Sequence, residues 1–212
     1  MNVYDTIVRI WAEYDGLREW TRQPNYQDGF VYGTDTKGIV RVHHSKTEEV
    51  YEGQERLPVL SSPYEQLYFE RNLNEKLHLG KLEKLYNDIP MVNIERCDAC
   101  DGVGKVIYTF EYDDVFYDER LDCPVCGGYG YVDSFQSRRD FRCAVILEEG
   151  CGAFDHKYLY RLIQTMKTLE CDTVSLIYAP GDRYAFEFKD GIQVIIMNRI
   201  TEAEKFVSYG RT

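Results

Sequence analysis

The sequence lacks any apolar run approaching the roughly 18 residues that a membrane-spanning helix needs. Its first residues also lack the basic segment followed by an apolar segment that marks a secretory signal peptide. We therefore expect a cytoplasmic protein that makes no use of a membrane.

Sequence signatures of common catalytic sites are absent as well. The chain has no Gly-x-x-x-x-Gly-Lys-Ser/Thr loop, no His-Glu-x-x-His, no Gly-x-Ser-x-Gly and no Gly-x-Gly-x-x-Gly after a strand. We expect a protein without enzymatic activity and without catalytic residues.

Positive charge is also in short supply. The chain has 25 Lys and Arg against 36 Asp and Glu, which gives a formal net charge of -11. Such a surface repels phosphate as a whole, so any contact with nucleic acid requires a local basic patch. By contrast, 212 residues with 44% hydrophobic content are ample for a packed core. The composition predicts one globular domain, or one domain carrying an insertion.

Cysteine provides the strongest signal in the sequence. Residues 97–104 and 123–130 both read Cys-x-x-Cys-x-Gly-x-Gly, and 22 residues separate the two cysteine pairs. Paired Cys-x-x-Cys turns at this spacing are typical of a tetrahedral zinc site. We expect one Zn²⁺ per chain, and its predicted ligands are Cys97, Cys100, Cys123 and Cys126. The remaining cysteines, Cys143, Cys151 and Cys171, are interpreted as small buried hydrophobic residues.

The glycines of the two motifs have a predicted role of their own. Glycine adopts positive φ readily and lets the backbone pass close to the metal, where a Cβ would collide. The predicted metal-loop glycines are Gly102, Gly104, Gly128 and Gly130. Between the motifs, residues 105–122 alternate in polarity around Asp113 and Asp114, which predicts a β-hairpin.

These two motifs resemble the cysteine-rich zinc finger of the DnaJ chaperone family. Two units instead of the family's four imply one zinc site, and the His-Pro-Asp tripeptide of the J-domain is absent. Eight acidic residues against two basic ones between the first and last of these cysteines favour a protein partner over a phosphate backbone. Two hypotheses stay open: the metal only staples a small inserted hairpin, or the finger is also a docking surface.

Hydrophobic periodicity outlines the rest of the chain. Helices are expected over residues 3–20, over parts of 64–88, and from a helix cap at Asp155 onward. Strands are expected over residues 30–32, 39–42, 141–147, 174–178, 184–188 and 192–197. The predicted fold class is α+β with antiparallel sheets, together with an inserted zinc-binding β-hairpin finger.

Residues 154–200 resemble one repeat of the sliding clamps, the DNA polymerase processivity factors. The likeness lies in a basic-faced helix, the strand Asp172-Thr173-Val174-Ser175-Leu176, and a later strand ending Ile195-Ile196-Met197. Asp15-Gly16-Leu17-Arg18 and residues 29–42 are similar to the first half of such a domain. The resemblance implies a single clamp-like domain of two α/β repeats, with residues 1–95 and 135–212 as its halves and 96–134 as the inserted finger.

Clamp helices line a hole that holds DNA. The resemblance therefore implies DNA-facing roles for Lys157, Arg161 and Lys167 and an association with DNA replication or repair. Because one domain cannot close a ring, it also implies either homo-oligomerisation or a domain that does not encircle DNA. A solvated amphipathic helix has the same charge pattern. The alternative is a protein-binding adaptor with a DnaJ-type finger that makes no DNA contact.

Overall fold

The computed structural model describes residues 2–12, 18–53, 60–61, 63–64, 74–147, 151–178, 183–198 and 205–209. The chain divides into two units. Unit 1 consists of Met1–Asp88 and Cys143–Thr212, and unit 2 is Ile89–Arg142. No helix among the described residues is long and apolar enough to cross a membrane.

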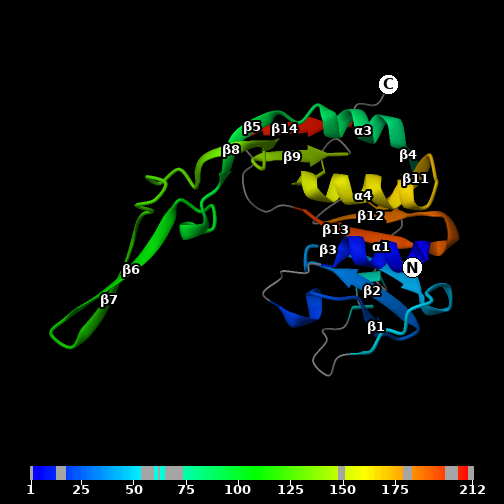
Figure 1. Ribbon diagram of the computed structural model, residues 1–212, viewed down its shortest axis with the longest axis horizontal. Coiled ribbons are helices and arrows are strands. Elements are labelled where there is room, and N and C mark those ends of the chain that lie inside the picture. The colour runs from blue at the N-terminus through cyan, green and yellow to red at the C-terminus, as the bar shows by residue number, and fades with distance from the viewer. Residues whose placement is uncertain are drawn as a thin grey trace. The chain divides into compact units, whose positions relative to one another are not determined.

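The centre of unit 1 is a seven-stranded antiparallel sheet (Figure 1). Its strand order is β1-β2-β3-β13-β12-β11-β4. The strands are β1 (Asn25–Gln27), β2 (Phe30–Thr34), β3 (Gly38–His43), β4 (Glu75–His78), β11 (Thr173–Tyr178), β12 (Arg183–Glu187) and β13 (Gln193–Met197). The hairpin expected from residues 30–32 and 39–42 is confirmed as β2 and β3, as are the three later strands.

Six of the seven strands form two three-stranded meanders, each preceded by a helix, and β4 is added at the edge beside β11. Helix α1 (Val3–Trp11) precedes β1-β2-β3, and α4 (His156–Thr168) precedes β11-β12-β13. The two meanders meet through their last strands, where Ile195 lies opposite Ile39. The predicted α+β class with two antiparallel repeats is therefore confirmed.

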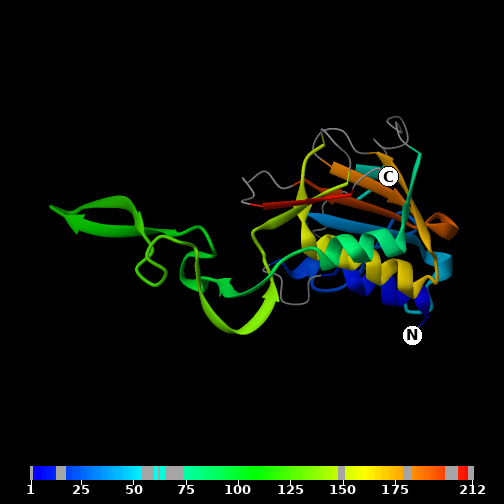
Figure 2. The same ribbon diagram turned by 90° about the horizontal axis from the view of Figure 1, so that it is seen from above.

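Among the described residues of unit 1, helix α4 contacts both α1 and α3 (Leu79–Asn87). The helices lie on one face of the large sheet (Figure 2). The apolar face predicted for α4 is buried, including Leu159, Leu162 and Met166. Asp155 occupies the position before the helix as expected, but its side chain makes no capping hydrogen bond.

A smaller three-stranded sheet completes unit 1. It consists of β9 (Cys143–Ile146) between β10 (Phe154–Asp155) and β14 (Lys205–Ser208). The pairing of β14 with β9 is parallel, unlike every other described strand pair. The strand expected over residues 141–147 corresponds to β9.

Two expectations for helices were wrong in part. The helix expected over residues 3–20 ends at Trp11, because Ala12 is extended, and residues 13–17 lie outside the described part of the chain. Within 64–88, Glu75–His78 is strand β4, which pairs with β11 along four residues. Leu77 lies opposite Val174 there, so its burial comes from the sheet and not from a helical face.

Unit 2 is built from two antiparallel strand pairs. Strand β5 (Met91–Arg96) pairs with β8 (Tyr131–Arg139), and β6 (Lys105–Tyr112) pairs with β7 (Val115–Asp122). The expected hairpin over residues 105–122 is confirmed, with its turn at Asp113 and Asp114. Both turn residues have positive φ, at 54° and 59°, as a tight two-residue hairpin turn requires.

Candidate metal centre

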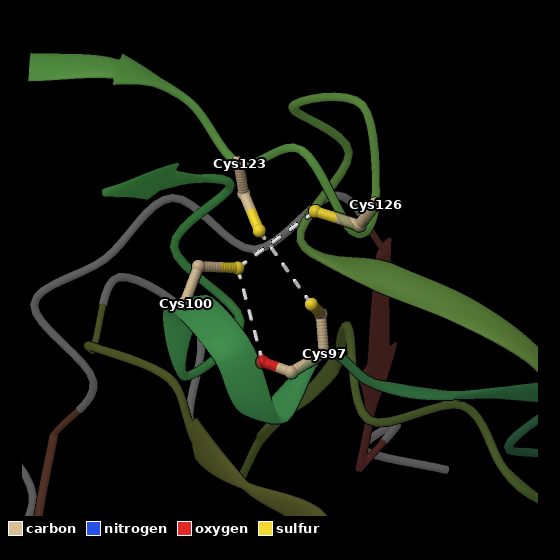
Figure 3. A group of neighbouring side chains, drawn as sticks. All are labelled: Cys97, Cys100, Cys123 and Cys126. Atoms are coloured by element: carbon tan, nitrogen blue, oxygen red, sulfur yellow. Dashed lines mark hydrogen bonds between the residues drawn. The ribbon is translucent and has the colours of Figure 1, made fainter. Parts of the chain in front are cut away.

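The four predicted ligand cysteines converge in unit 2. Cys97 directly follows β5, Cys100 ends the short 3-10 helix Asp98–Cys100, and Cys123 directly follows β7. Cys126 lies three residues beyond Cys123. Their Sγ atoms all lie within 4.8 Å of one another, and Figure 3 shows the four side chains pointing into a common space. The site is therefore closed by two segments that are far apart in the sequence.

The sulfur geometry fits a metal site and not a disulfide. The Sγ atoms of Cys97 and Cys123 are 3.8 Å apart, as are those of Cys100 and Cys126. A disulfide bond is only about 2.05 Å long. A tetrahedron of sulfurs around a metal at about 2.3 Å has edges of about 3.8 Å. The four buried thiols thus have the spacing of one tetrahedral thiolate site.

Backbone amides donate to the sulfurs in matching fashion. The N–H of Gly104 donates to Cys100 Sγ, and the N–H of Gly130 donates to Cys126 Sγ, both at 3.2 Å. In each motif the donor is the last glycine and the acceptor is the second cysteine. Such bonds stabilise a negatively charged thiolate and orient it.

The same two glycines also join the motifs to each other. The N–H of Cys97 donates to Gly130 O at 3.0 Å, and the N–H of Cys123 donates to Gly104 O at 2.9 Å. The first cysteine of each motif is therefore held by the last glycine of the other. The two copies of Cys-x-x-Cys-x-Gly-x-Gly form one reciprocal structure around the sulfurs.

Steric limits explain why glycine occupies these positions. All four predicted metal-loop glycines have positive φ: Gly102 (+75°), Gly104 (+77°), Gly128 (+89°) and Gly130 (+80°). A Cβ at Gly104 would lie 2.2 Å from Gly128 O, and one at Gly130 would lie 2.4 Å from Gly102 O. The backbones of the two motifs thus approach each other more closely than any side chain permits.

The thiols differ in acidity because their surroundings differ. Burial and a hydrogen bond with Cys100 raise the pKa of Cys97 to about 12. Burial would also raise the pKa of Cys126, but the N–H of Gly130 and the neighbouring thiols outweigh it and lower that pKa to about 7. Of these two thiols, Cys126 is therefore the one that deprotonates more readily.

The basic residues of α4 lie in unit 1 and are ion-paired there. Lys157 Nζ is 3.0 Å and Arg161 Nη1 is 2.7 Å from Asp35 Oδ2, whereas Lys167 Nζ is 2.7 Å from Glu83 Oε1 on α3. The side chains of Lys157 and Lys167 are 45% and 51% exposed, but that of Arg161 is only 17% exposed. The three cations therefore divide between two carboxylates on different elements.

Asp35 is a buried anion that the sequence did not single out. Its carboxylate also accepts from the hydroxyl of Tyr158 at 3.0 Å and from the N–H of Gly38 at 2.9 Å. Burial raises the pKa of Asp35, but Lys157, Arg161 and the Gly38 N–H outweigh it, so the pKa lies below its ordinary value. This network joins α4 to the β2-β3 turn.

Comparison with known proteins gives limited likenesses. No family model matches the chain, and no curated protein matches it. Among solved structures, it is similar to the DNA polymerase III subunit beta from Pseudomonas aeruginosa, with 7% identity and a TM-score of 0.43 over 93% of this chain and 65% of that one. For the DnaN sliding clamp from Bartonella birtlesii these values are 8%, 0.42, 95% and 65%.

A PCNA structure from Thermococcus kodakaraensis is more distant, with 10% identity and a TM-score of 0.28 over 83% of this chain and 64% of that one. The chain spans less than two thirds of the length of each of these structures. With identities of 7–10% and TM-scores of 0.28–0.43, these similarities give no information about what the chain binds.

Proposed function

We propose that the chain is a zinc-binding protein-interaction module without enzymatic activity, in which unit 2 is a DnaJ-type finger that contacts a partner protein. The observation that carries this proposal is the closed set of four buried cysteines with tetrahedral spacing. The chemistry of the donor set points to Zn²⁺, because thiolates are soft ligands and zinc commonly binds four of them in a tetrahedral arrangement. Cys97, Cys100, Cys123 and Cys126 would hold the ion.

The metal's proposed role is structural. A site with four protein ligands leaves no coordination position for a substrate or a reactive water, unlike catalytic zinc sites with three protein ligands. When bound, zinc would crosslink the β5-β8 strand pair to the β6-β7 strand pair. The finger would then present its exposed residues to a partner.

Elemental analysis of the purified full chain tests the metal. We expect about one zinc per chain in the wild type and a loss of stoichiometric zinc in Cys123→Ala. Cys171→Ala is the matched control, because Cys171 lies outside the cluster and should leave the zinc content unchanged. Absence of zinc from the wild type, or full zinc retention in Cys123→Ala, would remove the basis of the proposal.

DNA contact through α4 stays a prediction, and the ion pairs show how to test it. Lys157 and Lys167 are about half exposed, so they are the cations available to a phosphate backbone. The test compares the wild type with Lys157→Ala plus Lys167→Ala for binding a DNA duplex at low salt. Arg161 is left intact, because its loss would leave the buried carboxylate of Asp35 without its nearest cation. Binding that the double variant abolishes would support the DNA-facing role, and no binding by the wild type would refute it.

A further inference from the structure

The β6-β7 hairpin exposes an unusual amount of apolar surface. Every residue of β7 is exposed, and so is every residue of β6 except Val106. Of the exposed large apolar residues in unit 2, eight lie on these two strands. They are Ile107, Tyr108, Phe110, Tyr112, Val115, Phe116, Tyr117 and Leu121.

Strand register sorts these residues onto two different faces. Residues directly opposite each other share a face, and faces alternate along each strand. The pairs Tyr112↔Val115, Phe110↔Tyr117 and Val106↔Leu121 fall on one face, together with Tyr108. We call Tyr108, Phe110, Tyr112, Val115, Tyr117 and Leu121 the aromatic face.

The opposite face is polar. It carries the ion pair of Lys105 with Asp122 and the hydrogen bond from Thr109 to Asp118. Its apolar members are Ile107 and Phe116, which are each 70% exposed and lie opposite charged residues. The hairpin is therefore amphipathic, and all of its residues except Val106 are exposed.

Side-chain contacts hold the aromatic face together at its centre and at its base. Phe110 and Tyr117 stack across the strands with centroids 5.4 Å apart. Val106, on the same face, packs against the cysteine cluster. The face's residues are 40–71% exposed, and four half-exposed aromatic side chains present roughly 400 Å² of surface. A patch of roughly this size equals the largest apolar patch on a typical monomer, and such a patch is often a functional site.

Charge around the face selects the occupant. The hairpin has two cations, Lys105 and Arg120, and six carboxylates: Glu111, Asp113, Asp114, Asp118, Glu119 and Asp122. Glu119 lies on the aromatic face itself, opposite Tyr108, and two of the carboxylates form the tip. We propose that the aromatic face docks an amphipathic segment of a partner protein, whose apolar stripe is flanked by Lys and Arg. This inference rests on the proposed function and specifies its partner.

A second copy of the chain fits the same face poorly. Self-association through this face would place Glu119 of each copy in an interface from which water is excluded, without a cation on the same face to pair with it. A basic segment instead places its cations beside Glu119 and the two tip aspartates. Long Lys and Arg side chains can cover aromatic rings while keeping their charged ends at these carboxylates.

Fluorescence anisotropy with the zinc-loaded full chain tests the inference. The probe is a short labelled peptide with leucines at helical spacing and lysines elsewhere, and its control has glutamate in place of each lysine. Phe110→Ser plus Tyr117→Ser should weaken binding of the lysine peptide at least about tenfold. The matched control Ile107→Ser plus Phe116→Ser removes one exposed apolar residue from each strand on the opposite face, and it should leave affinity within about twofold.

A second variant keeps the turn and the rings but removes charge. Glu119→Gln with Asp113→Asn and Asp114→Asn should weaken binding of the lysine peptide and flatten its salt dependence, because three carboxylates are lost. The turn should be kept, because asparagine tolerates the positive φ of both turn positions. Equal losses in the two serine variants, or equal affinity for both peptides, would overturn the inference. A sedimentation shift to dimer that Phe110→Ser plus Tyr117→Ser abolishes would also overturn it, by making a second copy the occupant. Zinc content separates these failures from that of the proposed function, which needs the metal and not this face.

Discussion

Unit 1 and unit 2 bury different kinds of side chain. Large aromatic residues fill unit 1, including Trp11, Tyr158 and Phe186, none of them more than 1% exposed. In residues 89–142, all of which the structure describes, the cluster of buried side chains is the four cysteines, with Val106 and Val132 packed against it. Each buried aromatic side chain contributes roughly 2–3 kcal/mol to folding. Unit 2 has little of this contribution, so the proposed metal would supply most of its stability.

The two units also differ in how their buried polar groups are satisfied. In unit 1 the buried Asp35 carboxylate is satisfied by side chains and a backbone amide that folding brings to it. In unit 2 the buried Asp140 pairs with Arg142 at 2.8 Å, whereas the four buried thiols face one another, and a cation in their midst would balance them as thiolates. One unit can therefore complete its core alone, and the other cannot.

Removal of the metal ligand should therefore separate the two units most clearly. In Cys123→Ala we expect unit 2 to unfold, since structural zinc supplies about 10–16 kcal/mol to such fingers, while unit 1 stays folded. Both tryptophans, Trp11 and Trp20, belong to unit 1, so their fluorescence reports that unit alone. The measurement is an unchanged tryptophan unfolding curve together with rapid proteolysis within residues 89–142.

Chelation of zinc from the wild type provides the same test without a substitution. A tryptophan unfolding midpoint that falls by the same amount as the protease resistance of unit 2 would contradict the separation. The two units would then fold as one cooperative body.

A smaller effect is expected from a single methyl group in the finger. Gly104→Ala places a Cβ 2.2 Å from Gly128 O, and it disturbs the N–H that donates to Cys100 Sγ. We expect zinc affinity to fall about 10- to 100-fold, as for other groups that orient metal ligands. Competition with a chromophoric chelator measures this change.

Gly127→Ala is the matched control for that substitution. Gly127 also has positive φ, at 61°, but a Cβ there would meet nothing nearer than 3.7 Å. It therefore costs only the backbone strain, about 1 kcal/mol or a fivefold loss. Equal losses in both variants would mean that strain, and not the close approach of the two motifs, explains the glycine.

The parts that could be predicted from the sequence are those with local causes. The ligand cysteines, the hairpin with its Asp113-Asp114 turn and the apolar face of α4 each follow from spacing within a few residues. The reciprocal bonding of Gly104 and Gly130 was missed, although the repetition of the motif was a signal for it. Two copies of one motif pattern that share a single site favour a symmetric arrangement, in which each copy forms hydrogen bonds to the other.

The parts that escaped prediction depend on distant partners. Leu77 fits a helical spacing, yet its strand forms because β11, nearly 100 residues later, offers an edge to pair with. Asp35 looks like an ordinary turn residue, because its cation Arg161 is 126 residues away. The clustering of the four cysteines could be predicted from 34 residues of sequence, whereas the buried anion of unit 1 could be identified only from the fold.

A change in the stability of unit 1 alone is expected from neutralising that anion. Asp35→Asn should lower the free energy of unfolding of unit 1 by about 2–3 kcal/mol at neutral pH, a figure held down by the exposure of Lys157. Because the folded pKa of Asp35 is depressed, its stabilisation is present above the unfolded pKa of about 3.9 and is lost as pH falls through the folded value. Tryptophan-detected denaturation should show wild type and variant converging in acid. Glu83→Gln, which removes the exposed partner of Lys167 on the same helix, should cost less than about 0.5 kcal/mol; a loss as large as that of Asp35→Asn would mean that burial is not what distinguishes the two ion pairs.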